Sequence, residues 1–321
     1  MNNQPPHIPF TYFVNIFAHN EELIIAQAIE AVLAQKIGAG EKLELHIFAN
    51  GCSDKTEEIV RQYEAKDNRV KLHALKVKGK VKALKEAISY YHQRGLNEND
   101  LLFNLDADIT FEQPNCFELL KTKLATDPDL FVVSSYPAPS SYFDQRRDFV
   151  AQLFNIRYEL HKAFAVNTIR GACYVIKWNK LVQVDFPDDL ISDDMYLECA
   201  LAGHFLMDYE NIVITEIKEN LQKEIARDLF HRIAAEQVYH KNRTGLIKRI
   251  DKETARDQFR LTHQEPKKYL SYLLGKFKIS PLFIMLYWSF VSRKNKKKAH
   301  QIFFDSLESK LDLISYWSTI R

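Results

Sequence analysis

The sequence predicts an α/β fold with a Rossmann-like, mostly parallel sheet flanked by helices. Two observations lead to this prediction. Over residues 10–110, short apolar runs rich in β-branched and aromatic residues alternate with segments of helical periodicity. The fourth run, LLFNL, is followed at once by two aspartates one residue apart. The chain has 321 residues, 46% of them hydrophobic, which is enough to bury a substantial core.

The first part of the chain shows the alternation most clearly. Residues 10–18, 43–49, 69–75 and 100–105 are predicted to be strands, and residues 21–35, 53–63 and 80–91 to be the helices between them. Asn20 is expected to cap the first helix, and Asp54 and Glu57 have the spacing of a capping box in the second. Strands that alternate with helices of this length pair in parallel through right-handed crossovers.

Beyond residue 111 the alternation is less regular. Residues 116–125, 148–165 and 193–203 are predicted to be helical, and residues 137–145 to be a loop. Residues 130–136 are predicted to be extended, residues 171–176 to be a strand, and residues 204–214 to form one or two strands. From about residue 218 the chain is predicted to be mostly helical and increasingly basic. A C-terminal helical extension therefore follows the α/β region.

Composition and charge exclude several classes of protein. The formal net charge is only +2, which argues against nucleic acid as a partner. The four cysteines (Cys52, Cys116, Cys173 and Cys199) form no C-x-x-C pair, which fits a reducing compartment rather than a disulfide scaffold. The amino terminus lacks a secretory signal, and no apolar run reaches the ~20 residues of a membrane-spanning helix. We therefore expect a cytoplasmic protein.

Asp106 and Asp108 are the first candidates for chemistry, because they follow a strand that is predicted to be buried. Ligands of open α/β sheets bind at the carboxyl ends of the strands. Two carboxylates at such a place suit Mg²⁺ or Mn²⁺, which bind hard oxygen ligands together with the phosphates of a nucleotide. A second D-x-D pair, Asp127 and Asp129, contains Pro128 and is predicted to be a turn after a helix.

Six motifs together resemble glycosyltransferase family 2, whose members have the GT-A fold. They are VNIFAHNEE, FANGCSDKTEEIV, GKVKALKEAI, NLDAD, RGACYVI and ISDDMYLECALAG, in this order over residues 10–210. The resemblance implies a catalytic domain over residues 1–217, with a nucleotide-binding half at 10–110 and an acceptor-side half at 111–217. Residues 218–321 would form the C-terminal, mostly helical segment.

The resemblance also implies roles for the residues that match the nucleotide-binding motifs. Ala18, Asn20 and Glu21 would border the base and ribose of the donor, and Asn50 and Asp54 would read the base. Many relatives have two aspartates where this chain has Ala49 and Asn50, and an amide both donates and accepts. The base therefore stays open, with a UDP-sugar favoured.

The remaining motifs imply the groups that surround the diphosphate and the sugar. Lys80 belongs to a glycine–lysine pair that opens the third helix, where it could meet phosphate or stay a solvated lysine. Asp106 would contact the ribose or the metal, and Asp108 the metal and the diphosphate. Gly171 and Ala172 would line the pocket of the donor sugar.

Asp194 is the candidate catalytic base, since Asp193-Asp194 matches the acidic dipeptide of the family. An acceptor hydroxyl must lose its proton as it attacks the anomeric carbon, and a positioned carboxylate can take it. The alternative is that Ser192 and the two aspartates only begin a helix. His231 and Arg232 lie where related enzymes bring a third metal ligand or a basic residue to the diphosphate, or they are structural.

The resulting hypothesis is an inverting, metal-dependent glycosyltransferase that transfers one sugar to a glycan or lipid-linked acceptor. Single transfer is expected because the Q-x-x-R-W signature of processive relatives is absent. The alternatives are a non-catalytic nucleotide-sugar-binding protein and, less favoured, a sugar-phosphate nucleotidyltransferase. Residues 279–298 join apolar, aromatic sequence to the basic run RKNKKK, which predicts either peripheral contact with a membrane or a helical cover over the acceptor cleft.

Overall fold

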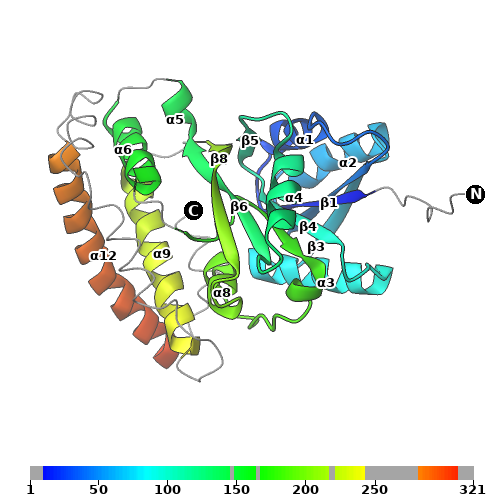
Figure 1. Cartoon of the computed structure of the whole chain (residues 1–321). Helices are drawn as coiled ribbons and strands as arrows, with labels where there is room; N and C mark the ends of the chain where they lie inside the picture. Colours follow the sequence, from blue (N-terminus) through cyan, green and yellow to red (C-terminus); the bar gives the residue numbers. More distant parts are fainter. Residues whose placement is uncertain (1–9, 145–147, 164–166, 217–220, 243–280, 310–321) are drawn as a thin grey trace, which may run out of the picture.

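The computed structural model describes residues 10–144, 148–163, 167–216, 221–242 and 281–309 (Figure 1). Its centre is one eight-stranded sheet with the strand order β3-β2-β1-β4-β7-β6-β8-β5. The strands are β1 (Thr11–Ala18), β2 (Lys42–Asn50), β3 (Val70–Leu75), β4 (Leu101–Asp106), β5 (Ile109–Phe111), β6 (Val132–Pro139), β7 (Cys173–Lys177) and β8 (Phe205–Thr215). The sheet continues through both predicted halves of the catalytic region.

The helices of the described residues lie between and after these strands. They are α1 (Ile25–Leu33), α2 (Thr56–Lys66), α3 (Lys80–Arg94), α4 (Cys116–Thr126), α5 (Ser140–Phe143), α6 (Phe149–Ala163), α7 (Trp178–Leu181), α8 (Asp193–Ala200), α9 (Leu221–Asn242) and α12 (Pro281–Ser309). The segment pattern predicted from sequence is thus confirmed in its order, although several boundaries differ.

The sheet is mixed, with parallel pairing in its first part. β1 pairs in parallel with β2 and β4, β2 with β3, and β6 with β8, whereas β7 runs antiparallel to β4 and β6, and β5 antiparallel to β8. The predicted mostly parallel sheet is therefore confirmed. β1 lies in the interior of the sheet, and its residues from Tyr12 to Ala18 are all buried, as expected for a strand covered on both faces.

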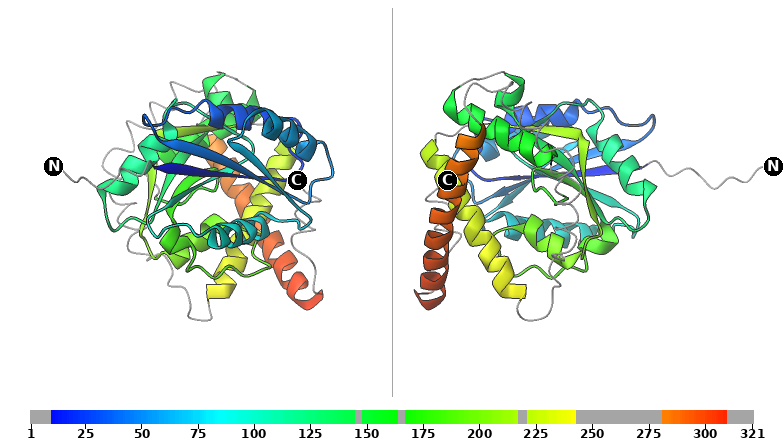
Figure 2. Two further views of the ribbon diagram at one scale, coloured as in Figure 1. Left: turned by 90° about the vertical axis from the view of Figure 1, so that its right-hand side faces the viewer. Right: turned by 60° about the vertical axis from the view of Figure 1, so that its left-hand side comes forward.

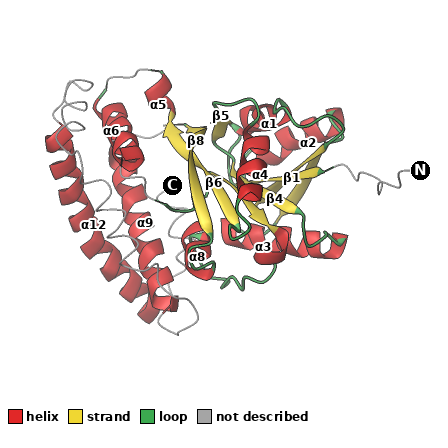
Figure 3. Cartoon of the chain, viewed as in Figure 1, coloured by secondary structure: helices red, strands yellow, loops and turns green. Residues whose placement is uncertain are grey.

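Two apolar cores cover the two faces of the sheet, which Figure 3 shows between layers of helices. One core joins β1, β2 and β4 to α1, α2 and α4, and includes Ile29, Val60 and Phe117. The other joins the opposite side of the same strands to α3, α7 and α8, and includes Leu84 and Leu197. The start of α3 and of α8 are thereby fixed against the same face.

The predicted N-terminal caps are wrong in detail. α1 begins at Ile25, and Asn20 has a φ of 56° outside the helix. Its side-chain oxygen instead accepts a hydrogen bond from the N–H of Ser53, 2.8 Å away. The capping box is absent as well, because Glu57 pairs with Arg61 while Asp54 accepts from the N–H and hydroxyl of Thr56. The loops after β1 and β2 use these polar groups to bind one another.

The predicted loop at 137–145 is also wrong in part. β6 continues to Pro139, because its pairing with β8 resumes at Tyr136 after an irregularity in register. α5 then occupies Ser140–Phe143, and residue 145 lies outside the described residues. β8 is one strand of 11 residues.

In the C-terminal segment the described residues form the long helices α9 and α12, as expected of a segment predicted to be mostly helical. α9 and α12 pack side by side at the edge of the molecule, with α12 on the outside (Figures 1 and 2). Residues 243–280 and 310–321, which were also predicted to be largely helical, lie outside the described residues. In the described part of the chain, no helix has the length and apolar character needed to cross a membrane.

Candidate active site

The predicted site residues gather where the parallel strands of the first half end. Ala18 lies opposite Ala49 in the register of β1 and β2, and Phe17 lies opposite Asp106 in the register of β1 and β4. The loops after these strands and the start of α3 therefore share one edge of the sheet, as expected for a parallel α/β arrangement.

Asn50 connects two of these segments from a buried position. Its side-chain N–H group donates to the carbonyl of Ala18 at 2.8 Å, and its side-chain oxygen accepts from the N–H of Gly79 at 3.1 Å. Gly79 has a φ of 113°, a conformation that favours glycine, and Lys80 follows it as the first residue of α3. Both ends of the amide are engaged within the protein, so Asn50 positions Gly79, and its contact with the base stays a prediction.

The loops after β1 and β2 are linked by further hydrogen bonds. Besides the bond from Ser53 to Asn20, the N–H of Glu22 donates to Asp54 at 3.0 Å, and the N–H of Glu21 donates to the hydroxyl of Thr56 at 2.8 Å. Hydrogen bonds from Thr56 and Glu22 lower the pKa of Asp54 against the opposing effect of its burial. The residues predicted to meet the base and ribose thus form one connected surface.

Lys80 lies at the centre of the candidate site. Its Nζ is 2.6 Å from Oδ1 of Asp106, 3.1 Å from the carbonyl oxygen of Gly171 and 3.7 Å from Oδ1 of Asp193. The three partners come from the end of β4, the segment before β7 and the start of α8. A single ammonium group therefore joins segments that are far apart in the sequence, and the contact of Lys80 with phosphate stays a prediction.

A side chain at Gly171 would crowd the charged groups of Lys80 and Asp194. A Cβ atom there would lie 2.9 Å from Nζ of Lys80 and 3.3 Å from Oδ2 of Asp194. The adjacent Ala172 is held to β4, since its carbonyl accepts from the N–H of Asp106 at 3.0 Å. The small residues predicted to line the sugar pocket therefore let Lys80 and Asp194 approach the same stretch of backbone.

The acidic dipeptide at the start of α8 divides into two roles. The carboxylate of Asp193 is buried, with the hydroxyl of Tyr174 at 3.3 Å on one oxygen and Lys80 near the other. Asp194 accepts from the N–H of Gly171 at 3.1 Å, from the N–H of Met195 at 2.8 Å and from the hydroxyl of Ser192. Asp193 thus supports the cluster, and Asp194 is oriented by donors on both oxygens.

The pKa values of the carboxylates in the cluster shift in different directions. Burial raises the pKa of Asp106 and of Asp193, and Lys80 opposes this shift in each case. Burial opposes ionisation of Asp194 too, but Lys80, Ser192 and the N–H of Met195 outweigh it and lower its pKa. Asp194 is consequently ionised at neutral pH. Burial alone would lower the pKa of Lys80, yet the surrounding carboxylates raise it, so the ammonium keeps its charge.

The other predicted ligands lie around this cluster. Asp108 is partly buried, and its charge contributes to the raised pKa of Asp106. His231 is exposed on α9, and its charge helps to lower the pKa of Asp194, while Arg232 beside it is partly buried. Among the described residues, no three His, Cys, Asp or Glu side chains together form a metal site. The carboxylates of Asp106 and Asp108 offer the hard oxygen atoms that Mg²⁺ and Mn²⁺ prefer.

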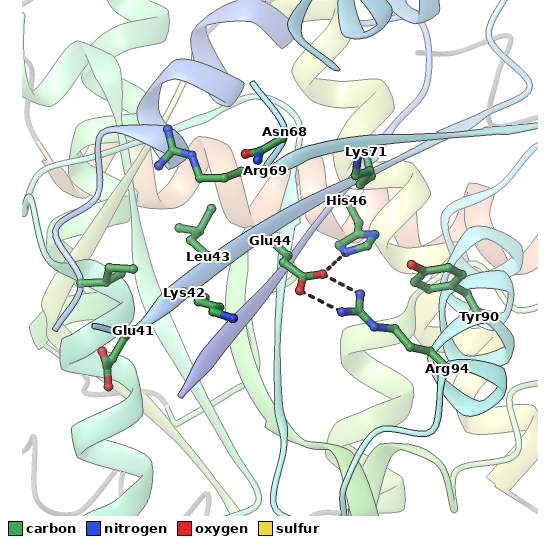
Figure 4. Close-up of a pocket in the computed structure, with 11 residues that line it drawn as sticks. Glu41, Lys42, Leu43, Glu44, His46, Asn68, Arg69, Lys71, Tyr90 and Arg94 are labelled. Carbon is green, nitrogen blue, oxygen red and sulfur yellow. Dashed lines mark hydrogen bonds and ion pairs between the residues drawn. The ribbon is translucent and has the colours of Figure 1, made fainter. Parts of the chain in front are cut away.

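A cavity of about 650 Å³ lies at the other end of α3, remote from the acidic cluster. Figure 4 shows that Glu44 at this cavity pairs with Arg94, at 2.5 and 2.8 Å, and with His46 at 3.4 Å. Burial and the adjacent His73 lower the pKa of His46 to about 4, so that its ring is neutral. Since this cavity lies at the amino-terminal end of β2, and ligands of α/β sheets bind at the carboxyl ends of the strands, we place the candidate active site at Lys80 instead.

Comparison with known proteins identifies the family of the chain. The family model "Glycosyl transferase family 2" matches residues 13–177, which include β1, Lys80, Asp106 and Gly171. The chain belongs to glycosyl transferase family 2. It is 27% identical over 183 residues to poly-beta-1,6-N-acetyl-D-glucosamine synthase of Staphylococcus aureus (strain COL), a match that covers 55% of this chain and 42% of that protein. The chain thus spans less than half the length of this curated relative.

A solved structure of similar fold supports the GT-A assignment of this family 2 chain. It is the mannosyltransferase PcManGT from Pyrobaculum calidifontis in complex with GDP-Man and Mn²⁺, with a TM-score of 0.58 and 15% sequence identity. The similarity covers 98% of this chain and 86% of that protein. The GT-A fold and the glycosyltransferase family predicted from the six motifs are therefore confirmed.

Glu198 lies close to the candidate active site but was not identified from the sequence. It lies on α8, four residues after Asp194, and its carboxylate accepts from the N–H of Ile169 at 2.7 Å and from the hydroxyl of Thr168. Burial raises its pKa to about 7, and the charge of Asp194 adds to this shift. Glu198 ties α8 to the segment that leads to Gly171. Glu198 follows Asp194 by about one helical turn, and this spacing could have indicated that both side chains lie on the same face of the helix.

Replacement of Lys80 by Met should destabilise the protein, because three carboxylates would lose their shared cation. We expect a loss of about 2 kcal/mol, below the ~3–5 kcal/mol of a fully buried pair since Lys80 and Asp106 are 25% and 38% exposed. The loss should increase with pH as the carboxylates ionise. Urea unfolding at pH 5 and pH 8 measures it. Lys85→Met, on the same helix with the exposed partner Asp188, is the matched control and should change little; equal losses would contradict the analysis.

Replacement of Glu198 by Gln should change how stability depends on pH. The folded-state pKa of about 7 exceeds the ordinary value of 4.5, so between these values the folded chain holds a proton that the unfolded chain has lost. This contribution makes wild-type stability fall as pH rises from about 4.5 to about 7. Gln keeps an oxygen acceptor and cannot ionise. The difference in free energy of unfolding between the two proteins should therefore shift in favour of the variant across this range.

The exposed residue Glu86 on α3 provides the control, because Glu86→Gln should run parallel to the wild type. Parallel curves for Glu198→Gln as well would show that Glu198 does not titrate as described.

Proposed function

We propose that this protein is an inverting, metal-dependent glycosyltransferase that moves one sugar from a nucleoside-diphosphate sugar to a hydroxyl of a glycan or lipid-linked acceptor. The observation that supports it most directly is the cluster of Asp106, Asp193 and Asp194 around Lys80 at the ends of the parallel strands. A donor diphosphate bound at the carboxyl ends of these strands would contact both the carboxylates and the ammonium group of Lys80.

Asp106 and Asp108 are the proposed ligands of a divalent cation, Mn²⁺ or Mg²⁺. Such a cation, when bound, neutralises the charge that develops on the leaving diphosphate. Mg²⁺ commonly uses one or two carboxylates together with substrate phosphates, so two aspartates at a strand end are a sufficient protein contribution. The proposed roles of His231, as a further ligand, and of Arg232, near the diphosphate, complete the set.

Asp194 is the proposed general base. The oxygen of the acceptor hydroxyl attacks the anomeric carbon, the bond from that carbon to the diphosphate oxygen breaks, and the hydroxyl proton passes to the carboxylate of Asp194. In-line attack inverts the configuration of the sugar. The three donors that fix Asp194 leave room for a hydrogen bond from the acceptor, since a carboxylate can accept about four hydrogen bonds.

The donor and the acceptor are proposed only as classes. UDP is the first nucleotide to test, as the sequence favours it, and GDP is the second because the structurally similar PcManGT binds GDP-Man. Transfer of a single sugar belongs to the proposal, although the name of the S. aureus relative describes a polymer synthase. A step of polysaccharide or glycolipid synthesis on the cytoplasmic side of a membrane would fit, with peripheral contact through residues 279–298, of which 279 and 280 lie outside the described residues.

Replacement of Asp108 by Ala should remove the Mn²⁺-dependent part of nucleotide binding. A thermal-shift titration of UDP, GDP and their sugars, with and without Mn²⁺, measures this, because a ligand at a hundredfold excess over its Kd stabilises by ~2.7 kcal/mol. Asp129→Ala is the matched control, because Asp129 belongs to the other D-x-D pair. The N–H of Asp129 donates to the carboxylate of Asp127 within a turn. Metal-dependent stabilisation that persists in Asp108→Ala would reject the proposed ligand.

Replacement of Asp194 by Asn should lower turnover by a factor of ~10² to 10⁴ while donor affinity stays nearly the same. The reason is that the amide preserves the shape of the side chain but cannot take the proton. Release of nucleoside diphosphate in the presence of acceptor, together with donor titration, separates the two effects. Asp188→Asn, in the exposed segment before α8, should stay close to wild type. Near-normal turnover of Asp194→Asn would remove this residue from the role of base.

A further inference from the structure

Helix α12 packs against the rest of the protein through one narrow face. Val291, Asn295, Ala299 and Phe303, which recur every four residues, are buried. The side chain of Asn295 donates to the carbonyl of Ile225 on α9 at 3.2 Å. The ring of His300 on α12 lies 2.9 Å from the carboxylate of Glu236 on α9. These contacts fix the rotation of α12 about its own axis.

The opposite face of α12 begins with large apolar side chains that point away from α9. Phe283, Leu286 and Phe290 are 59%, 63% and 67% exposed. At 3.6 residues per turn they lie on one side of the helix, opposite Val291 and Asn295. The right view of Figure 2 shows α12, in orange and red, at the left edge of the molecule. A cluster of three exposed, large apolar side chains is typical of a surface that contacts a protein or a membrane.

The same face continues into a cationic surface. Arg293, Lys294 and Lys297 follow on the exposed side, and Lys296 and Lys298 flank them, all of them exposed. α12 thus presents an apolar stretch and then a basic stretch along one face, ahead of the exposed residues Phe304, Asp305 and Glu308. This order is the one found in helices that lie in the plane of a bilayer interface, where apolar groups enter the acyl region and Lys or Arg meets anionic headgroups.

Two other occupants fit this face less well. A cover over the acceptor cleft would turn its apolar residues toward the sheet, but α9 lies between α12 and the sheet (Figure 1). A symmetric dimer through the apolar residues would leave the cationic surface without an anionic partner, because the second copy presents the same basic residues there. An anionic bilayer complements both stretches of the face.

We propose that this face of α12 docks the protein on an anionic lipid bilayer. Phe283, Leu286 and Phe290 enter the headgroup–acyl boundary, and Arg293, Lys294 and Lys297 contact the lipid phosphates. The inference narrows the proposed membrane contact to a defined face and a defined lipid charge. It does not depend on the transferase chemistry, so its test is separate from activity.

Co-sedimentation of the full chain with vesicles tests the proposal. Wild type should bind vesicles that contain phosphatidylserine and phosphatidylcholine, bind pure phosphatidylcholine much more weakly, and be released from anionic vesicles by salt. The triple variants Phe283→Ser/Leu286→Ser/Phe290→Ser and Arg293→Glu/Lys294→Glu/Lys297→Glu should each lose binding by about tenfold or more. Unchanged thermal unfolding of these exposed-face variants shows that they are folded.

Matched controls lie on other elements. Leu23 is 89% exposed before α1, and Lys66, Lys71 and Lys76 are exposed on or near α2 and β3. Leu23→Ser and Lys66→Glu/Lys71→Glu/Lys76→Glu should keep wild-type binding. The proposal is overturned if wild type does not bind anionic vesicles, or if the controls lose as much binding as the α12 variants. A wild-type dimer that the apolar triple variant dissociates, without vesicle binding, would identify a second copy as the occupant instead.

Discussion

The ion cluster of Lys80 is the interaction on which the candidate site depends. One ammonium group meets the end of β4 through Asp106, the backbone at Gly171 and the start of α8 through Asp193. Carboxylates that leave water are stable only when a cation or hydrogen-bond donors compensate them. The positions of three segments that come from separate parts of the chain are thus set by one side chain, whose own place is fixed by Gly79 and the start of α3.

The cluster also carries an excess of negative charge, which favours the binding of a cation. Asp106, Asp193 and Asp194 carry more negative charge than Lys80 can neutralise, and the charge of Asp108 acts on Asp106 as well. An excess of carboxylate at the carboxyl edge of a sheet attracts a divalent cation, and that cation in turn attracts phosphate. Lys80 can then serve both states, since its ammonium compensates carboxylates in the free protein and can face a diphosphate in the proposed donor complex.

The sequence predicted the strands, the helices between them and Asp106 at a strand end, because these features depend on local periodicity and on the rule that ligands meet strand ends. It did not predict that Asn20 lies outside the first helix and accepts a hydrogen bond from Ser53. It also did not predict that the side-chain amide of Asn50 donates to Ala18 and accepts from Gly79. Those contacts join residues about thirty positions apart, so no local pattern reveals them. The clamp of Glu198 on Ile169 is of the same kind.

The docking face of α12 and the candidate base are mechanically connected. The segment that leads into α8 is tied to α9, since the N–H of Ile191 donates to Gln237 at 2.8 Å and Gln237 donates back to the carbonyl of Asp189. Ile191 also packs against a small core shared by α9 and α12, which contains Ile233 and Ala299. A bilayer that holds α12 would therefore set the orientation of the segment that carries Asp194. For an acceptor attached to lipid, this connection would place the proton-accepting carboxylate at a fixed height above the surface on which the acceptor moves.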